Sequence, residues 1–306
     1  MKRLSKVILG ITFSIIITYF LLKNTSLNEL IKSISEANIG IIFLGFLAYL
    51  TLYLARTIRF QKVSKIRSFK KTFSVVCIHN FLNNIIPFKV GELSYPLMLK
   101  RRFKIPFSKA LADLTIMRFF DLMSLGLILV IAVLFSYQYF SNLLSYSLIS
   151  LAILILIFFI VFFLSKFSNK TSRKNKILNF FLLALSNLSK RSKKDIIFLT
   201  ISTPIISLLM FLTAFSIIRG LGLDAPFSII VIGGTLSILA TLIPIQGPLN
   251  IGTTEIGYIF PFIVYGIAKE KAIAISFSYH IFILIFTLIL FLIGISLSKS
   301  QNKEAL

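Results

Sequence analysis

The sequence predicts an all-α integral membrane protein with about six full spans and two oppositely oriented, interrupted or re-entrant helical hairpins that form an inverted repeat. Three observations predict this fold class. Of the 306 residues, 57% are hydrophobic and only 14% are charged. Apolar runs of about 20 residues, long enough to cross a bilayer, recur along the chain. The charge is one-sided, with 33 Lys and Arg against 10 Asp and Glu, for a formal net charge of +23.

This charge does not indicate a nucleic-acid-binding protein. A soluble basic protein carries Lys and Arg over a polar surface, whereas the mean hydropathy here is +0.94. Most of the cations instead gather in five clusters, at residues 2–6, 56–71, 100–109, 166–194 and 299–303. The positive-inside rule places all five clusters, and therefore both termini, on the cytoplasmic side of the cell membrane. Anionic lipids of the inner leaflet are the expected partners of these loops.

Six apolar runs have the length and flanking charges of full spans. They are Val7–Leu22, Ile39–Ala55, Leu111–Phe135, Tyr146–Leu164, Ile196–Ile218 and Ala272–Leu297. The first run follows basic residues, as in a signal peptide, but bulky residues stand where cleavage needs small ones, so we expect an uncleaved helix. We expect residues 1–306 to form one multi-pass transmembrane domain with a basic cytoplasmic loop at 165–195.

Residues 72–99 differ from these spans because the stretch begins and ends at a cytoplasmic cluster. Its arms, Thr72–Ile86 and Val90–Leu99, correspond to about 22 and 15 Å of helix. Neither arm crosses a hydrocarbon core of about 30 Å. The stretch therefore predicts a re-entrant hairpin, with breaks at Pro87 and Gly91.

Residues 227–268 repeat this pattern from the opposite side. The arms Phe227–Ile243 and Ile251–Ala268 are separated by breaks at Pro244, Gly247 and Gly252. These arms are longer, and charge counting does not decide whether each spans fully. Paired interrupted segments in inverted halves indicate a transporter binding site near the bilayer midplane. The alternative is that Pro and Gly are simply tolerated in membrane helices.

Polar and charged residues within the predicted membrane region are candidates for binding a substrate or headgroup, because burying a charge there costs at least about 3 kcal/mol. The candidates are Asn83, Asn84, Lys89, Glu92, Arg118, Asp121, Gln246 and Glu255. The sequence predicts Lys89 and Arg118 as the intramembrane cations, and it predicts an interfacial position for Asp113.

Each of these candidates also has a purely structural interpretation. Asn83 and Asn84 would cap broken helix ends, and Arg118 with Asp121, three residues later, would form an intrahelical pair. Glu255 follows Gly252 much as Glu92 follows Gly91, which suggests mirrored roles. His280 fits a hydrogen bond between helices.

Three motifs resemble those of a known family. Residues 83–93 resemble N-x-x-P-x-R-x-G-E, residues 118–121 resemble the end of E-R-x-x-D, and residues 244–255 resemble P-x-x-P-G-G-L-G-x-R-E. Together they resemble the transmembrane region of lysylphosphatidylglycerol synthases, a family of flippase-like membrane proteins. Four positions depart from the family pattern, namely Tyr95, Met117, Asn250 and Thr254. The resemblance implies a lipid translocase module, and we expect no soluble aminoacyl-transfer domain.

The leading hypothesis is therefore movement of a phospholipid or a polyprenyl-linked glycolipid across the membrane. The alternatives are an intramembrane enzyme acting on lipid-linked sugars, an accessory subunit that docks a glycosyltransferase or synthase, and an ion-coupled carrier of small solutes. One cysteine and two histidines provide no pattern for a metal site, and there is no P-loop for ATP. We accordingly expect no catalytic residue, metal or cofactor.

Overall fold

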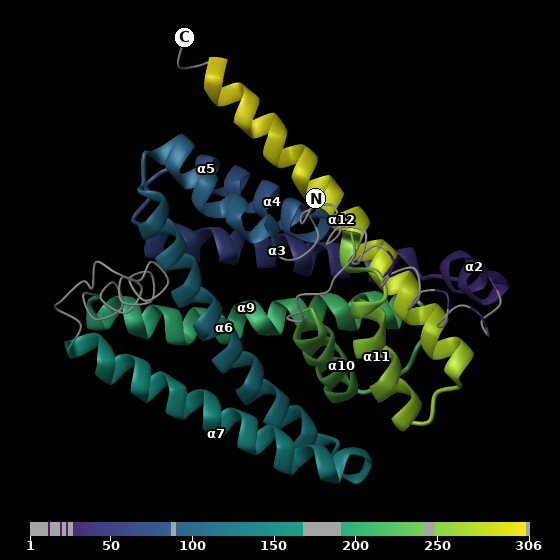
Figure 1. The fold of residues 1–306 in the computed structure, drawn as a ribbon. Coiled ribbons are helices and arrows are strands. Elements are labelled where there is room, and N and C mark those ends of the chain that lie inside the picture. Colours follow the sequence, from purple (N-terminus) through teal and green to yellow (C-terminus); the bar gives the residue numbers. More distant parts are fainter. Residues whose placement is uncertain are drawn as a thin grey trace.

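The computed structural model describes residues 27–86, 90–167, 191–241 and 248–303, together with positions 12, 19 and 23. These residues form ten α-helices and two short 3-10 helices, and they contain no strand (Figure 1). The elements are α2 (Leu27–Ser35), α3 (Ile39–Ser64), α4 (Phe69–Ile85), η1 (Val90–Leu93), α5 (Ser94–Phe103), α6 (Phe107–Phe135), α7 (Tyr137–Phe167), α9 (Lys193–Gly220), α10 (Phe227–Ala240), η2 (Pro248–Asn250), α11 (Thr253–Val264) and α12 (Lys269–Lys303).

Five of the described helices are long and apolar enough to cross a bilayer, as expected of a multi-pass membrane protein. They are α3, α6, α9, residues 137–157 of α7 and residues 269–298 of α12. Each corresponds to one of the predicted spans. The remaining predicted span, Val7–Leu22, and most of the basic loop at 165–195 lie outside the described residues.

Helix α3 corrects the predicted end of its span. The helix continues from Ala55 to Ser64, so Arg56 and Arg59 belong to the helix and not to a loop. Arg59 is only 3% exposed. The prediction that Lys89 and Arg118 are the intramembrane cations is therefore incomplete, because α3 contributes two further arginines.

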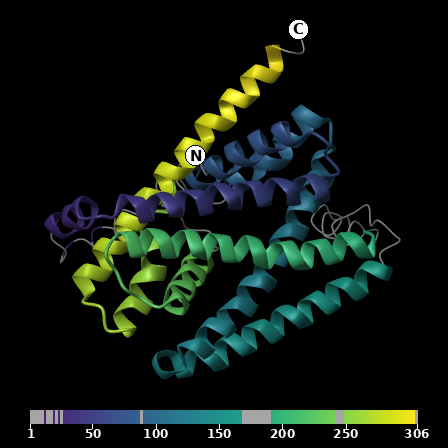
Figure 2. The same ribbon diagram turned by 180° about the vertical axis from the view of Figure 1, so that it is seen from behind.

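Helices α3 and α9 lie side by side and antiparallel (Figure 2). At one end the Asn38 amide donates to the Gly220 carbonyl at 2.7 Å, and at the other Arg191 donates to the Val63 carbonyl at 3.3 Å. The absence of a side chain at Gly45 allows this approach, since a Cβ there would lie 3.2 Å from side-chain atoms of α9. The pair forms the centre on which both hairpins pack.

The first hairpin consists of α4, η1 and α5. Its helices have 17 and 10 residues, about 25 and 15 Å. Gly91 lies against the end of α4, where a Cβ would overlap the Leu82 carbonyl and the Asn83 backbone. Glycine at this position therefore lets the chain turn back directly onto α4. Pro87 lies outside the described residues.

The second hairpin consists of α10, η2 and α11. Its helices have 14 and 12 residues, about 21 and 18 Å, so both are shorter than the predicted arms and shorter than the hydrocarbon core of about 30 Å. Gly252, with φ of 89°, directly precedes α11. A Cβ on Gly257 would overlap the Ser237 backbone, so α10 and α11 are in backbone contact. Pro244 and Gly247 lie outside the described residues.

Both hairpins pack on the same two long helices, α6 and α12, each hairpin using one arm for each helix. In the first, α5 packs on α6 and α4 packs on α12, while in the second α11 packs on α12 and α10 packs on α6. This shared packing brings the hairpins together near their breaks, where the side-chain Nδ2 of Asn250 donates to Asn84 Oδ1 at 3.5 Å. The residues at the two breaks therefore line a common region.

We predict that Gly257→Ala destabilises the fold. The added methyl group would meet the Ser237 backbone, which cannot rotate away, and overpacking of this kind costs about 1–3 kcal/mol. The sequence has one cysteine, Cys77, and it is buried, so a thiol-reactive dye added during heating reports unfolding. We expect a midpoint several degrees lower. Gly40→Ala is the control, because a Cβ there meets only the Asn38 side chain, and an equal shift in both variants would contradict the prediction.

Candidate functional site

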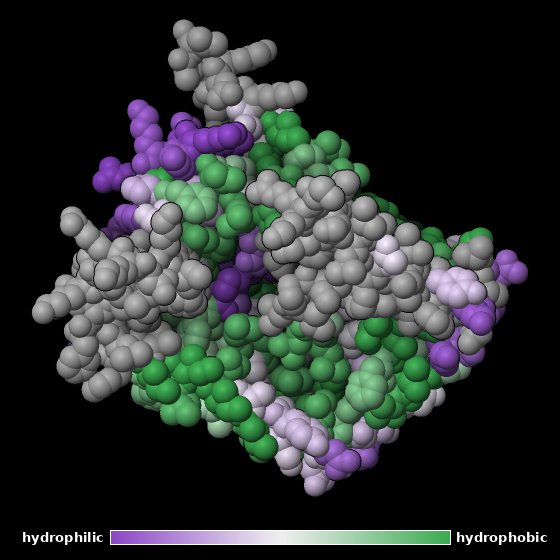
Figure 3. All heavy atoms as spheres, viewed as in Figure 1, coloured by the Kyte–Doolittle hydropathy of each residue, from purple (hydrophilic) through white to green (hydrophobic). Residues whose placement is uncertain are grey.

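Charged and polar side chains from α3, α4 and α6 surround a small cavity that we call the polar recess. Its lining residues are Arg56, Arg59, Phe60, His79, Asn80, Leu114, Met117, Arg118 and Asp121. Figure 3 shows hydrophilic atoms set back within a mainly hydrophobic face, in the region where α3, α6 and α9 meet in Figure 1. The open volume is about 10 Å³, room for about one water molecule.

Arg59 and Asp121 form the central ion pair of the recess. Arg59 Nη1 lies 2.5 Å from Asp121 Oδ1, and Nη2 lies 3.3 Å from Oδ2, so the guanidinium binds the carboxylate through two contacts. Arg59 also donates to Thr203 Oγ1 of α9 at 3.2 Å. A buried arginine without a counter-charge would be strongly destabilising. This pair therefore fixes α3, α6 and α9 relative to one another.

Arg118 forms a second, weaker set of contacts. Its Nη1 lies 3.5 Å from Asp121 Oδ2, which is the predicted pairing three residues apart, and its Nη2 lies 3.3 Å from Glu92 Oε1. The Arg118 side chain is 40% exposed, so solvent competes with both contacts. The Glu92 contact connects the first hairpin to α6.

The polar residues of α4 have separate partners. Arg56 donates to Asn80 Oδ1 at 3.2 Å, and His79 Nδ1 lies 2.9 Å from Ser94 Oγ on the second arm of the hairpin. Among the described residues, buried Asn83 Oδ1 has no hydrogen-bond partner. Thus His79 joins the arms of the hairpin, while Asn80 faces the recess.

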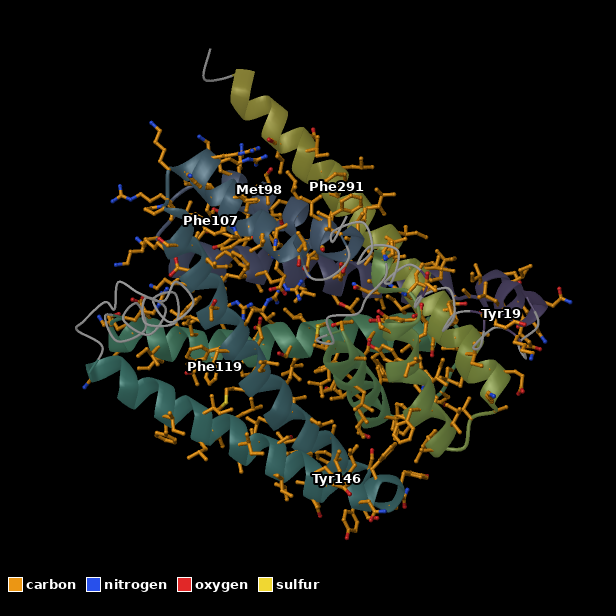
Figure 4. The ribbon with its side chains drawn as sticks, in the orientation of Figure 1. Tyr19, Met98, Phe107, Phe119, Tyr146 and Phe291 are labelled. Atoms are coloured by element: carbon orange, nitrogen blue, oxygen red, sulfur yellow. The ribbon has the colours of Figure 1, made fainter. Side chains whose placement is uncertain are left out.

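A second cavity, the apolar groove, lies between the two hairpin breaks and α12 and has a volume of about 280 Å³. Its lining residues are Phe81, Asn84, Ile85, Leu249, Leu284, Ile285, Thr287 and Leu288. Ile285 and Leu288 are each 44% exposed, so the groove opens on the outer surface of α12. At its edge Phe81 stacks on Phe291, which Figure 4 labels on α12, with 3.7 Å between the ring centroids.

Helix α4 connects the two cavities. Asn80 lines the polar recess and Asn84 lines the apolar groove. Residues four apart occupy the same face of a helix, about one turn from each other. A molecule with a polar end and an apolar end would therefore find both environments along one face of α4.

Glu255 lies in a separate buried pair. Its Oε1 is 2.7 Å from His280 Nδ1, and its Oε2 accepts the Gly252 amide at 2.7 Å. The Glu255 side chain is 1% exposed. It therefore holds the start of α11 and joins that helix to α12, and it lines neither cavity.

The structure thus brings together only part of the predicted site. Glu92, Arg118 and Asp121 form one cluster, Asn84 lies in the apolar groove, and Glu255 lies elsewhere. Lys89 and Gln246 lie outside the described residues. Within the described part of the chain, no group of three His, Cys, Asp or Glu residues is placed to hold a metal ion.

Sequence reasoning missed Arg56 and Arg59 as site residues because they were counted with the loop cations that follow. Their three-residue spacing, continuous with the apolar run from Ile39, was the available signal. Asp113 is 2% exposed, and it pairs with Arg191 at 2.6 Å and accepts from Ser64 at 3.1 Å, so its carboxylate is buried within the protein. Its predicted position at the membrane interface stays a prediction.

Comparison with known proteins identifies one family. A family model described as "Lysylphosphatidylglycerol synthase TM region" matches residues 7–290, which include both cavities. No curated protein matches the chain.

We predict that the Arg59–Asp121 pair behaves as a coupled unit in a double-mutant cycle. Arg59→Gln leaves the largely buried Asp121 carboxylate with only its weaker Arg118 contact and should cost about 3 kcal/mol, whereas adding Asp121→Asn should restore part of that loss. Thermal unfolding followed through Cys77 labelling measures both effects. Arg118→Gln is the control within the same cluster, and because Arg118 is exposed we expect a change below about 1 kcal/mol. Additive effects of the two substitutions would contradict coupling.

Proposed function

Because the chain belongs to the lysylphosphatidylglycerol synthase transmembrane-region family, we propose that it moves an amphiphile across the cell membrane. The amphiphile is a phospholipid or a polyprenyl-linked glycolipid. One observation carries the proposal: successive turns of α4 line a charged recess and an apolar groove. A headgroup requires polar partners, whereas an acyl or prenyl chain requires an apolar surface open to the lipid.

The hairpins support a translocation role. Both are interrupted, both consist of helices shorter than the hydrocarbon core, and they approach each other through Asn84 and Asn250. Interrupted segments of this kind form substrate sites in transporters, because the broken helix ends offer polar backbone groups within the membrane. Both hairpins pack on α6 and α12, so the two interrupted segments lie against the same pair of long helices.

Translocation without chemical change fits the carboxylates better than catalysis does. General acid–base chemistry needs a carboxyl group that is free to exchange a proton with the substrate. Asp121 is held by two arginines and Glu255 is buried against His280, so among the described residues the partly exposed Glu92 has no second free carboxyl group beside it to complete an acid–base pair. We therefore propose a transporter rather than an enzyme.

We further propose that both termini and the basic clusters lie on the cytoplasmic side of the cell membrane, supported by the one-sided grouping of cations. In that orientation the exposed Lys65, Lys70 and Arg101 would meet anionic headgroups of the inner leaflet. A glycosyltransferase or synthase that supplies or consumes the lipid is the expected protein partner.

Leaflet exchange in proteoliposomes tests the proposed function. With fluorescent phospholipids and a membrane-impermeant quencher, we expect the protein to raise the fraction of label that becomes quenched. Ile285→Trp should slow exchange because it fills the mouth of the groove, whereas Leu292→Trp, exposed on the same helix but outside the groove, should not. Mass spectrometry of the recovered lipid should find it unchanged. No exchange across a broad panel that includes polyprenyl-linked lipids, or a chemically altered lipid, would contradict the proposal.

A further inference from the structure

The charges of the polar recess do not balance. Arg56, Arg59 and Arg118 line it, while the carboxylates bound to them are Asp121 and Glu92. Asp121 binds Arg59 and Arg118, and Glu92 binds Arg118. Among the described residues, the direct contacts of Arg56 are with neutral groups, namely the Asn80 amide oxygen and the face of the Tyr53 ring at 5.9 Å, while Asp121 acts on it through space without a direct contact. The recess therefore has the electrostatic composition of an anion site.

The two carboxylates are held very differently. Asp121 contacts a guanidinium that is 3% exposed, at 2.5 and 3.3 Å. Glu92 contacts a guanidinium that is 40% exposed, through one contact at 3.3 Å. A buried two-contact pair persists, whereas an exposed single contact contributes little and exchanges readily. Glu92, which binds Arg118 but does not itself line the recess, is thus the carboxylate that another anion could replace.

The recess is also too small for a ligand as it stands. An open volume of about 10 Å³ holds about one water molecule, so a tetrahedral oxyanion enters only when a side chain moves. Of the charges paired at the recess, Arg118 is the most exposed, and its movement away from Glu92 would open the site toward the surface. Arginine binds phosphate oxygens through paired N–H donors, and Arg56 and Arg118 both line the recess.

From this arrangement we infer that the phosphate of a lipid headgroup binds between Arg56 and Arg118 and displaces Glu92 from Arg118. This inference rests on the proposed function, and it names the group of the amphiphile that the site recognises. Because Glu92 belongs to η1, its release would free the turn of the first hairpin from α6. Headgroup binding and movement of the hairpin would then be one event.

Native mass spectrometry of the full chain tests the inference. The probes are dioctanoyl phosphatidic acid, which carries the phosphate, and dioctanoylglycerol, which lacks it. We expect the wild-type protein to bind phosphatidic acid more tightly. Arg56→Gln should reduce that preference about tenfold, as expected for loss of a charged hydrogen bond. Arg56→Lys should retain part of it. Arg219→Gln, the same change at an exposed arginine outside the five basic clusters, is the matched control and should leave the preference unchanged.

Glu92→Gln distinguishes a carboxylate that competes with the phosphate from one that only stabilises the fold. If Glu92 competes with the phosphate, its neutralisation should tighten phosphatidic acid binding about two- to fivefold. If the pair only stabilises the fold, the same change should weaken binding or leave it unchanged, and the inference is then wrong. Glu36→Gln is the matched control at an exposed position.

Displacement of the lipid by inorganic phosphate at an equal concentration would identify free phosphate as the ligand and overturn the headgroup assignment.

Leaflet exchange separates this inference from the proposed function. Exchange that is indifferent to the phosphate and to Arg56→Gln overturns the phosphate site and leaves translocation standing. Arg56-dependent binding of phosphatidic acid without any leaflet exchange would overturn the proposed translocation and would leave the phosphate site supported.

Discussion

A charge placed among apolar helices must find its counter-charge inside the protein, and the core of this molecule is organised around that constraint. The Arg59–Asp121 pair meets it by joining α3 to α6, and Thr203 adds α9 through the same guanidinium. The first hairpin then docks on this cluster through Arg56–Asn80 and Arg118–Glu92. One ion pair therefore determines where three long helices meet and what the hairpin encounters there.

The hairpins solve a related problem, because a broken helix exposes backbone polar groups that the membrane does not satisfy. Gly91 and Gly257 allow backbones to touch, which closes each hairpin without intervening side chains. At the second break Glu255 accepts the Gly252 amide and is itself held by His280. At the first break Glu92 turns away to Arg118. Two Gly and Glu elements that look equivalent in the sequence thus have different roles, one closing a helix end and the other facing a cluster of cations.

Hydropathy and charge predicted the five long apolar helices that the structure describes and the places where shorter helices interrupt them, because these depend on local composition and length. They did not predict which charges meet. Asp121 follows Arg59 by 62 positions and Arg191 follows Asp113 by 78, so both pairings arise only when distant helices pack. The same limit explains why Arg56 and Arg59 were not predicted as site residues. A charged residue at the end of an apolar run usually lies in a loop, and here specific partners on α4, α6 and α9 offset the cost of placing both arginines on a helix in the core.

The unequal burial of Arg59 and Arg118, the arginines that hold the two carboxylates, gives the polar recess two functions at once. A membrane site that binds and releases a charged group cannot leave its own charges bare between events, because the uncompensated charge would be costly. A tightly buried pair such as Arg59–Asp121 protects the core but cannot exchange. A partly exposed pair such as Arg118–Glu92 compensates the charge in the empty site and still yields to a stronger anion. Asp121 therefore stabilises the fold, and Glu92 makes binding reversible. Because Arg118 contacts both carboxylates, it can release Glu92 while the Arg59–Asp121 pair stays in place.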